Sequence, residues 1–525
     1  MIERIIENWL INVNEKSFQT PFCQLLISEG YKVVHLSRHG SFEEGKDILA
    51  IDPDGTPCAF QLKGSNGKKM SQNEWGKYVD QIVRLVEIPI DHPSIDKNLK
   101  RNVCFVLNGE LEEEVRVEIT KRNADWKSRK CPELDTILLG ELIERFSKMY
   151  TEIWPIRLSS EKDLLELYLN DGRGYLDKNK FSDFFEKINL INKKSKKIEI
   201  QRLLAGSSLY CSIALSPYER THNHVALIEG WTIFLAFLVS VVEENDLRKK
   251  YWTKTVEIIE ESVIQSLENL YQEVIDRKYL TTGNVLVDGP FYRGRITWLL
   301  SFLSAFYFLL RKISDEKRIN EKLELFFLEN FKYLFLWGEY AIPQLLAIMW
   351  GLHALGYEYL SNRLLYLMFK GVLEKTISEV GLAPPYHNLG EIILNETMLS
   401  NNLKEFKISG RSYSLNSLIH ILTKQGYRGI IAENWQKISK IQLAEFIPLN
   451  SINFCLWHCE SGSLNEFIPN SLQSWNELQF QAKSINLEII PKYFRDKPEF
   501  LLIFLIVFPH RINSDIVKFL NDSLQ

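Results

Sequence analysis

The spacing of apolar residues changes at about residue 155. Before that point, short apolar runs of strand length alternate with segments whose apolar residues recur at the spacing of a helix face. Read in order, the pattern predicts a helix, three strands, a helix, a strand, a helix, a strand and a helix, which together indicate a mixed sheet flanked by helices. Strands are predicted at 31–37, 47–52, 58–63, 102–107 and the start of 135–149, and helices at 18–30, 71–88, 110–123 and the rest of 135–149.

Several local signals mark the ends of these elements. Gly30 follows the first helix at the position of a C-cap, and "PDGT" (53–56) predicts a hairpin turn between two strands. Ser71, with Glu74 three residues later, is a capping-box pattern that predicts where the helix over 71–88 begins.

Beyond about residue 160 the pattern is mostly helical, as in the long segments 252–280 and 320–340. Strand alternation is scarce until the end, where 483–494 and 499–508 fit either strands or short helices. The Lys-rich segment 186–204 fits a domain boundary or a solvated helix face.

Two apolar stretches, 224–242 and 296–310, have some features of membrane spans. The first contains Glu229, and the second is shorter than the roughly 20 residues that a span needs. We therefore expect buried helices of a large helical domain and no membrane partner.

Composition narrows the classes of protein. The formal net charge of −4 excludes a globally basic nucleic-acid-binding chain, so such a partner must be recognised by a local site. The seven cysteines form no CxxC pair, and the N-terminus lacks the features of a signal peptide. Both observations predict a cytoplasmic protein.

The most informative stretch is "GKDILAIDPDGTPCAFQLK" (45–63). Asp47 begins the second predicted strand, and Gln61 and Lys63 end the third, two residues apart and so on one face. The hairpin brings Asp47 near that pair. A carboxylate that holds Mg²⁺ beside a lysine that orients water suits phosphodiester hydrolysis. Gln61 and the backbone carbonyl of Leu62 offer further oxygen ligands.

"GKD" and "QLK", together with the order of elements across 18–107, resemble the PD-(D/E)XK restriction-endonuclease-like superfamily in its variant with Gln for the second acid. The resemblance implies Asp47 as a ligand of Mg²⁺ or Mn²⁺, Gln61 at the second ligand position and Lys63 as the catalytic lysine. It implies an α/β restriction-endonuclease-like domain over 1–155. The helical pattern beyond this domain predicts a helical connector over 156–205 and an α-helical sensor or oligomerisation domain over 206–525.

In this superfamily a Glu on the first helix often completes the site, and here Gln19 stands at that position. Glu15, Glu43 and Glu44 are the alternative acids. Gln81, on the helix after the third strand, lies where the superfamily often places a further site residue.

Basic residues near this motif are candidate nucleic-acid contacts. Lys68 and Lys69 belong to the loop "KGSNGKKMSQNEW" (63–75), which we expect to be flexible and able to follow a phosphate backbone. Arg38 and His39 precede the motif. The alternative for all four is an ordinary solvated loop.

Two other patterns have simpler interpretations. "CLWHC" (455–459) has three potential zinc ligands but no second ligand pair, so core packing is preferred. The segment 281–302 is expected to be a long inter-helix loop that delivers Arg293 and Arg295 to the start of an apolar helix.

We therefore expect a metal-dependent nuclease, for which the resemblance favours DNA over RNA as the substrate, with a helical region that senses, oligomerises or recruits a protein partner. The combination resembles effectors of prokaryotic antiphage defence. The alternative is a non-catalytic scaffold with a degenerate nuclease fold, which Gln19 and Gln61 favour because acids would stand there in an active enzyme.

Overall fold

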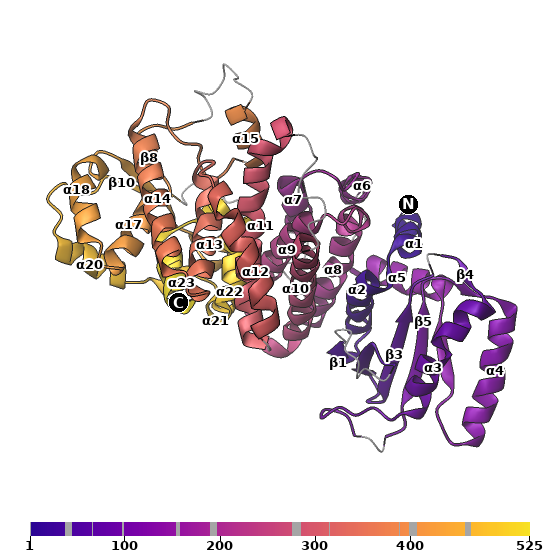
Figure 1. Cartoon of the computed structure of the whole chain (residues 1–525). Coiled ribbons are helices and arrows are strands. Elements are labelled where there is room, and N and C mark those ends of the chain that lie inside the picture. Colours follow the sequence, from indigo (N-terminus) through magenta and orange to yellow (C-terminus); the bar gives the residue numbers. More distant parts are fainter. Residues whose placement is uncertain are drawn as a thin grey trace. The chain divides into compact units, whose positions relative to one another are not determined.

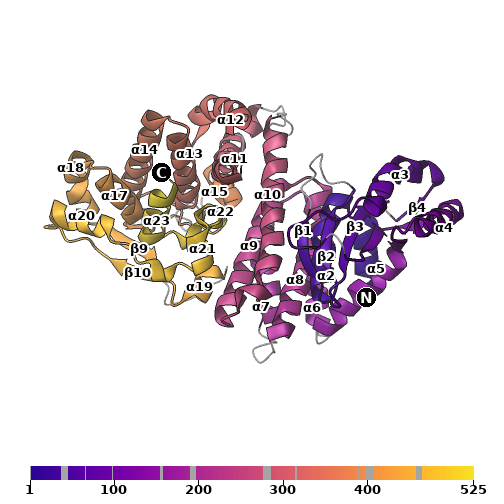
Figure 2. The same ribbon diagram turned by 90° about the horizontal axis from the view of Figure 1, so that it is seen from below.

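The chain folds into two compact units, which the computed structural model describes separately (Figures 1 and 2). The first unit contains residues 1–238 and 245–263, and the second contains 239–244 and 264–525. The described residues are 2–36, 45–65, 67–96, 99–153, 158–189, 197–275, 285–313, 316–387, 389–397, 407–456 and 464–524.

The first unit is built on a five-stranded sheet with the order β1-β2-β3-β5-β7. The β1–β2 and β2–β3 pairs are antiparallel, and the β3–β5 and β5–β7 pairs are parallel. The predicted mixed sheet is therefore confirmed. Its strands are β1 (Lys32–Leu36), β2 (Ile48–Ile51), β3 (Pro57–Lys63), β5 (Asn102–Leu107) and β7 (Leu134–Ile137).

The predicted turn between β2 and β3 sets their register. The Oδ1 atom of Asp52 accepts hydrogen bonds from the backbone N–H groups of Asp54 and Thr56, and Gly55 adopts φ +90°, which glycine tolerates at little cost. With this turn closed, Ile48 pairs with Phe60. The start of β2 therefore lies beside the end of β3.

Helices pack against both faces of this sheet. On one face Phe22 of α2 (Glu15–Ser28) contacts Phe60 of β3, with ring centroids 5.6 Å apart. On the other face Trp75 of α3 (Gln72–Glu87) contacts Phe105 of β5 at 5.5 Å. The sheet is thus buried between helices, as the sequence predicts. The α2 side also has α1 (Ile2–Asn12) and α5 (Leu139–Ile153), and the α3 side has α4 (Glu113–Ser128).

The capping box at the start of α3 is also confirmed. Ser71 accepts a hydrogen bond from the backbone of Glu74, and the Glu74 carboxylate accepts one from the backbone of Ser71. Two backbone donors that the helix leaves unpaired are satisfied in this way.

Further helices complete the first unit, and α2 packs against α8. These helices are α6 (Leu158–Tyr168), α7 (Lys178–Asn189), α8 (Lys197–Arg220), α9 (His224–Glu244) and α10 (Thr253–Ile275), the last two continuing into the second unit. Of the described helices, α9 alone is long and apolar enough to cross a bilayer, and 89% of its most apolar window is buried inside the protein. Glu229 in α9 forms an ion pair with Lys178 at 2.5 Å, which accounts for an acid in this apolar stretch.

The second unit is mainly helical, but it also contains a small sheet that the sequence pattern does not predict. A three-stranded sheet of order β10-β9-β8 lies within 411–467, where no strands are predicted. The strands are β8 (Arg411–Ser412), β9 (Gln442–Phe446) and β10 (Leu464–Phe467). The helices are α11 (Val285–Ile313), α12 (Glu316–Asn330), α13 (Ile342–Ala354), α14 (Glu358–Ile377), α15 (Leu389–Thr397), α17 (Leu415–Lys424), α18 (Arg428–Ile438), α19 (Ser451–Cys455), α20 (Trp475–Lys483), α21 (Lys492–Asp496), α22 (Pro498–Val507) and α23 (Ser514–Leu524).

One expectation for this unit is wrong, and an open alternative is resolved. Arg293 and Arg295 do not lie in a loop, because α11 already begins at Val285 and includes both. The ambiguous segments near the C-terminus form the short helices α21 and α22. Cys455 is buried in α19, while His458 and Cys459 lie outside the described residues.

Candidate active site at the ends of two strands

Asp47 is held against the end of β3 by three hydrogen bonds. Its backbone N–H donates to the carbonyl of Phe60 at 2.8 Å. Its Oδ2 atom accepts from the backbone N–H of Leu62 at 2.6 Å and from Nε2 of Gln61 at 2.7 Å. The carboxylate is only 4% exposed. The hairpin therefore brings Asp47 to Gln61, and the part of Leu62 that meets Asp47 is its N–H group.

Gly45 explains how the chain reaches Asp47. It adopts φ +75°, and a Cβ atom there would lie 2.3 Å from the backbone oxygen of Gln81 in α3. Only glycine permits both the conformation and this approach. The structure thus places the backbone of Gln81 beside the entry to β2, while the Gln81 side chain is exposed.

Lys63 shares a face of β3 with Gln61 and is bound by an acid from α2. Its Nζ atom lies 2.7 Å from Oε1 of Glu15 and 5.2 Å from the ring centroid of Tyr78 in α3. Lys63 is 6% exposed, whereas the side chain of its partner Glu15 is 32% exposed, so only the lysine end of this ion pair is buried. Glu15 is one of the acids that the sequence offers in place of Gln19.

Gln19 lies differently from the position that the resemblance implies. Along α2, Gln19 falls between Glu15 and Phe22 at four- and three-residue spacing, so it shares the side of the helix that contacts Phe60. Because successive strand residues point to opposite faces, Gln61 points away from that side. Within the described part of the chain, no hydrogen bond joins Gln19 to Asp47, Gln61 or Lys63.

Among the glutamines proposed for this site, two buried amide atoms have no hydrogen-bond partner in the described part of the chain. They are Oε1 of Gln61, whose residue is 2% exposed, and Nε2 of Gln19, whose residue is 6% exposed. A buried polar atom without a partner costs roughly 1–3 kcal/mol, so such atoms are rare in folded proteins. The Gln61 oxygen suits a cation or a water molecule.

The donor set beside Asp47 fits a hard cation that keeps part of its water shell. The structure offers the carboxylate of Asp47 and the amide oxygen of Gln61, while the Leu62 group that faces Asp47 is an N–H donor and not an oxygen ligand. Among the described residues there is no group of three or more His, Cys, Asp or Glu that could hold a metal. Mg²⁺ is often bound by one or two carboxylates together with water and substrate phosphates, and this set meets that minimum. Glu43 and Glu44 lie outside the described residues.

The basic loop after β3 is more ordered than the sequence suggests. Lys69 belongs to β4 (Lys69–Met70), which pairs with β6 (Glu110–Leu111). The Lys68 carbonyl accepts a hydrogen bond from Ser65. Both lysine side chains are exposed and available to a phosphate backbone. The other two candidate contacts, Arg38 and His39, lie outside the described residues.

A buried asparagine that the sequence analysis does not single out holds this region together. Asn108 accepts a hydrogen bond from the backbone of Ser65 and donates to the carbonyls of Leu10 and Val13. Gly109, which follows, lies so close to the loop that a Cβ atom would be 2.4 Å from the Lys68 carbonyl. The Asn-Gly pair after an apolar strand signals a turn, but its partners lie too far away in sequence to be inferred.

No family model, no curated protein sequence and no solved structure matches this chain. The resemblance to restriction-endonuclease-like enzymes rests on the two short sequence motifs and the order of elements around them. The geometry around Asp47 and Lys63 therefore has to carry the functional argument.

Proposed function

We propose that the first unit is a metal-dependent nuclease with a restriction-endonuclease-like fold that hydrolyses phosphodiester bonds, most readily those of DNA. One observation carries the proposal. Asp47, Gln61 and Lys63 are buried at the ends of two paired strands, and the Gln61 oxygen has no partner among the described residues. This oxygen lies beside the Asp47 carboxylate, where both groups are able to accept a cation or its water.

In this proposal Asp47, Gln61 and Lys63 have different roles in phosphodiester hydrolysis. In the reaction, water attacks phosphorus, one P–O ester bond breaks and the departing oxygen takes up a proton. A Mg²⁺ or Mn²⁺ ion, when bound, neutralises phosphate charge and lowers the pKa of water. Asp47, held by the Leu62 N–H, and Gln61 would provide oxygen ligands, and Lys63 would stabilise the charge that develops on the phosphate oxygens.

Glu15 would act as a positioning residue for Lys63. A lysine side chain has four rotatable carbon bonds, and a single ion pair at 2.7 Å restricts where its ammonium group lies. Tyr78 supports the same position from α3. Preorganisation of this kind lets the ammonium act on the phosphate without first being reoriented.

In this proposal the second unit senses a signal, oligomerises or recruits a protein partner, and the nuclease serves antiphage defence in the cytoplasm. This part rests on analogy with other nucleases joined to helical regions. The mostly helical character of residues beyond the sheet agrees with it but does not distinguish among these roles.

A non-catalytic scaffold is the second candidate. It is favoured by Gln61 at the second ligand position and by the small number of acids around Asp47 within the described residues. Such a scaffold would keep the fold and the exposed lysines but would not cleave nucleic acid.

Plasmid cleavage in Mg²⁺ or Mn²⁺ tests the proposal on the full chain. Asp47→Ala and Lys63→Ala are each expected to lower the cleavage rate by at least about 100-fold, the effect of removing one charge-stabilising group. Asp54→Ala and Lys100→Ala, which change exposed residues of the same unit, serve as matched controls. Cleavage that survives both site substitutions would show that this site is not the catalytic one.

A binding measurement separates the two candidates if cleavage is absent. An active site predicts that Mn²⁺ raises the melting temperature and that Asp47→Asn abolishes this rise. A scaffold predicts the same melting temperature with Mn²⁺ or with a chelator, for both proteins.

A further inference from the structure

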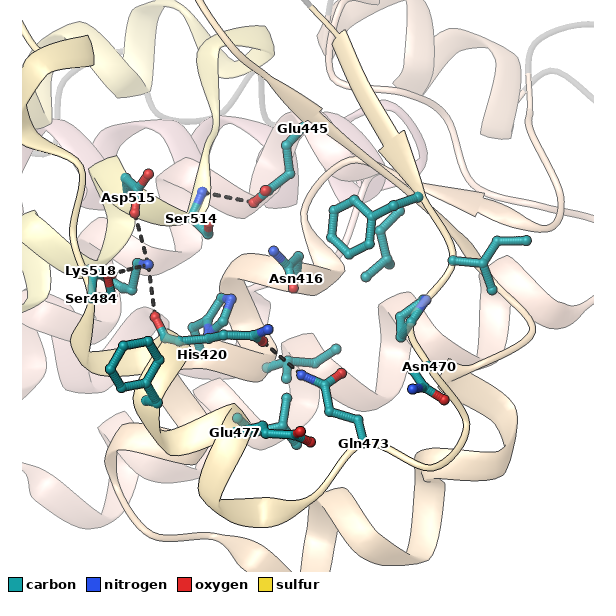
Figure 3. Close-up of a pocket in the computed structure, with 18 of the residues that line it drawn as sticks. Asn416, His420, Glu445, Asn470, Gln473, Glu477, Ser484, Ser514, Asp515 and Lys518 are labelled. Atoms are coloured by element: carbon teal, nitrogen blue, oxygen red, sulfur yellow. Dashed lines mark hydrogen bonds and ion pairs between the residues drawn. The ribbon is translucent and has the colours of Figure 1, made fainter.

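The second unit contains a cavity of about 640 Å³ that the nuclease proposal does not use (Figure 3). Its walls come from α17, α18, α20, α23 and the strands β9 and β10 with the segment that follows β10. Sites for small organic ligands in proteins typically have volumes of 300–1,000 Å³ and combine apolar walls with a few convergent polar groups. The cavity meets both criteria.

A buried histidine lines this cavity with an unused nitrogen. His420 of α17 is 5% exposed, and its Nδ1 atom has no hydrogen-bond partner among the described residues. Burial and the nearby Lys518 lower the pKa of His420 to about 3, so the imidazole is neutral at physiological pH. A neutral imidazole offers one donor and one acceptor. A ligand with both kinds of group would satisfy it.

The charges around the cavity disfavour an anion. Three acids line it, Glu445, Glu477 and Asp515, against the single cation Lys518. The Nζ atom of Lys518 lies 2.8 Å from Asp515 and also donates to the carbonyls of Gln481 and Ser484, as Figure 3 shows. The ammonium group is thus already committed to the protein. A phosphate would meet net negative charge in this cavity.

Aromatic rings form part of the cavity wall. Trp435 is anchored by a hydrogen bond from Nε1 to the carbonyl of Asn470 at 3.2 Å. Phe467 and Phe480 are 36% and 75% exposed. Large apolar side chains are usually less exposed than this, and a flat ligand stacked on them would shield them from water. The amide side chain of Asn416 projects into the same space (Figure 3). Aromatic faces with amide groups at the edge are how proteins hold unpaired bases.

We propose that this cavity binds the uncharged heteroaromatic base of a nucleoside, stacked on the aromatic wall and hydrogen-bonded at its edge by His420 and Asn416. The base belongs either to a free nucleoside or to a single-stranded nucleic acid whose phosphates stay outside. A nucleotide whose phosphate has to enter the cavity with the base is disfavoured by the surrounding carboxylates. Cleavage by the first unit is not required for this binding.

Isothermal titration of the full chain tests the proposal with adenosine, guanosine, cytidine and uridine, the corresponding 5′-monophosphates and a single-stranded hexanucleotide. At least one nucleoside is expected to bind, and its monophosphate to bind about 10-fold more weakly or worse. Tighter binding of the hexanucleotide would assign the base to a single strand, and tighter binding of the nucleoside would assign it to a free metabolite. Absence of binding by every nucleoside, or tighter binding of the monophosphates, overturns the proposal.

Substitutions link the binding to the cavity. Phe480→Ala, at an exposed position, is expected to weaken nucleoside binding at least 5-fold, and His420→Leu at least 10-fold. Tyr359→Ala, equally exposed on α14, is the matched control. Because His420 is buried, the melting temperature of His420→Leu is measured alongside. Unchanged affinity in the folded Phe480→Ala variant would contradict the assignment.

Glu477, one of the acids that line the cavity, allows the effect of negative charge to be tested separately. Glu477 closes the capping box of α20 with Ser474, and Gln preserves such a box while removing the charge. Glu477→Gln is therefore expected to reduce the ratio of the nucleoside affinity to the monophosphate affinity about 3-fold. Glu433→Gln on α18, an exposed acid outside the cavity lining, should leave the difference unchanged.

Discussion

Each unit buries a carboxylate, and the two differ in how fully their surroundings are satisfied. Asp47 of the first unit is 4% exposed and Glu339 of the second is 2% exposed. Glu339 accepts hydrogen bonds from the hydroxyls of Ser412 and Ser414 and from the backbone N–H groups of Tyr413 and Ser414. Asp47 accepts two from β3, and the neighbouring Gln61 keeps an oxygen without a partner among the described residues.

We interpret this difference as one between a structural role for Glu339 and the binding role that we propose for the site of Asp47. Donors from one short segment surround Glu339, so this acid joins that segment to the chain before α13. A fully satisfied buried network stabilises a fold, whereas a partly satisfied one is unfavourable until something else binds. The Asp47 neighbourhood is of the second kind. Two of the four predictions below test this contrast directly, and the other two compare the units in their response to pH and to salt.

The largest expected effect is on stability in the second unit. Glu339→Ala leaves the Ser412 and Ser414 hydroxyls and the Tyr413 N–H buried without their acceptor, and we expect the free energy of unfolding to fall by about 3–5 kcal/mol. Urea unfolding measures this loss. Glu374→Ala, at an exposed position on α14, is the control and should cost less than about 0.5 kcal/mol. An equally small loss for Glu339→Ala would remove the contrast.

The buried His420 predicts a pH dependence of stability. Its pKa in the folded protein is about 3, because burial and Lys518 disfavour the charged form, against 6.5 for an ordinary histidine. Between pH 3 and pH 6.5 the unfolded chain binds more protons than the folded protein. The free energy of unfolding therefore rises with pH in this range, and it decreases as the pH falls. The slope from this group is at most about 1.4 kcal/mol per pH unit.

Unfolding measured from pH 4 to pH 7 tests the sign. His420→Gln should flatten the dependence, while His92→Gln in the first unit should preserve it. A stability that increases toward pH 4 in the unaltered protein, with no change on His420→Gln, would contradict the assignment.

A smaller effect is expected from adding an acid at the candidate site. Gln61→Glu places a second carboxylate beside Asp47, and two carboxylates without a cation repel each other. We expect a loss of about 1–2 kcal/mol in a chelator and a larger rise in melting temperature on adding Mn²⁺ than in the unaltered protein. Gln436→Glu, on the exposed side of α18, controls for the added charge. An identical rise in melting temperature on adding Mn²⁺ to Gln61→Glu and to Gln436→Glu would argue against a cation beside Asp47.

The smallest effect concerns the exposed lysines after β3. Lys68→Ala and Lys69→Ala should each reduce the slope of log affinity against log salt by about 0.9 if each lysine contacts one phosphate of duplex DNA. Filter binding at several salt concentrations measures the slope, and Lys437→Ala in the second unit is the control. Stability should be unchanged, because both side chains are exposed.

Elements specified by neighbouring residues are found where the sequence predicts them, whereas elements that depend on distant residues are not. The strand over 102–107 and the capping box at Ser71 are found as predicted because neighbouring residues alone specify them. The short strands β8 and β9 pair across some 30 residues, and two residues of β8 are too few to show alternation. Glycine and proline signals predict a loop where α11 runs. There Gly294 instead permits a close approach to α15, since a Cβ atom would lie 2.2 Å from Ile393.

The amino-acid sequence by itself determined that Asp47 meets Gln61 and that Lys63 shares a strand face with Gln61, because a hairpin turn and the two-residue repeat of a strand are local properties. Only the tertiary structure decided that Glu15 rather than Gln19 meets Lys63, across 48 residues of chain. The same holds for the unpartnered oxygen of Gln61 and for the cavity around His420. Which polar atoms find partners, and which are left to bind something else, depends on how distant segments pack.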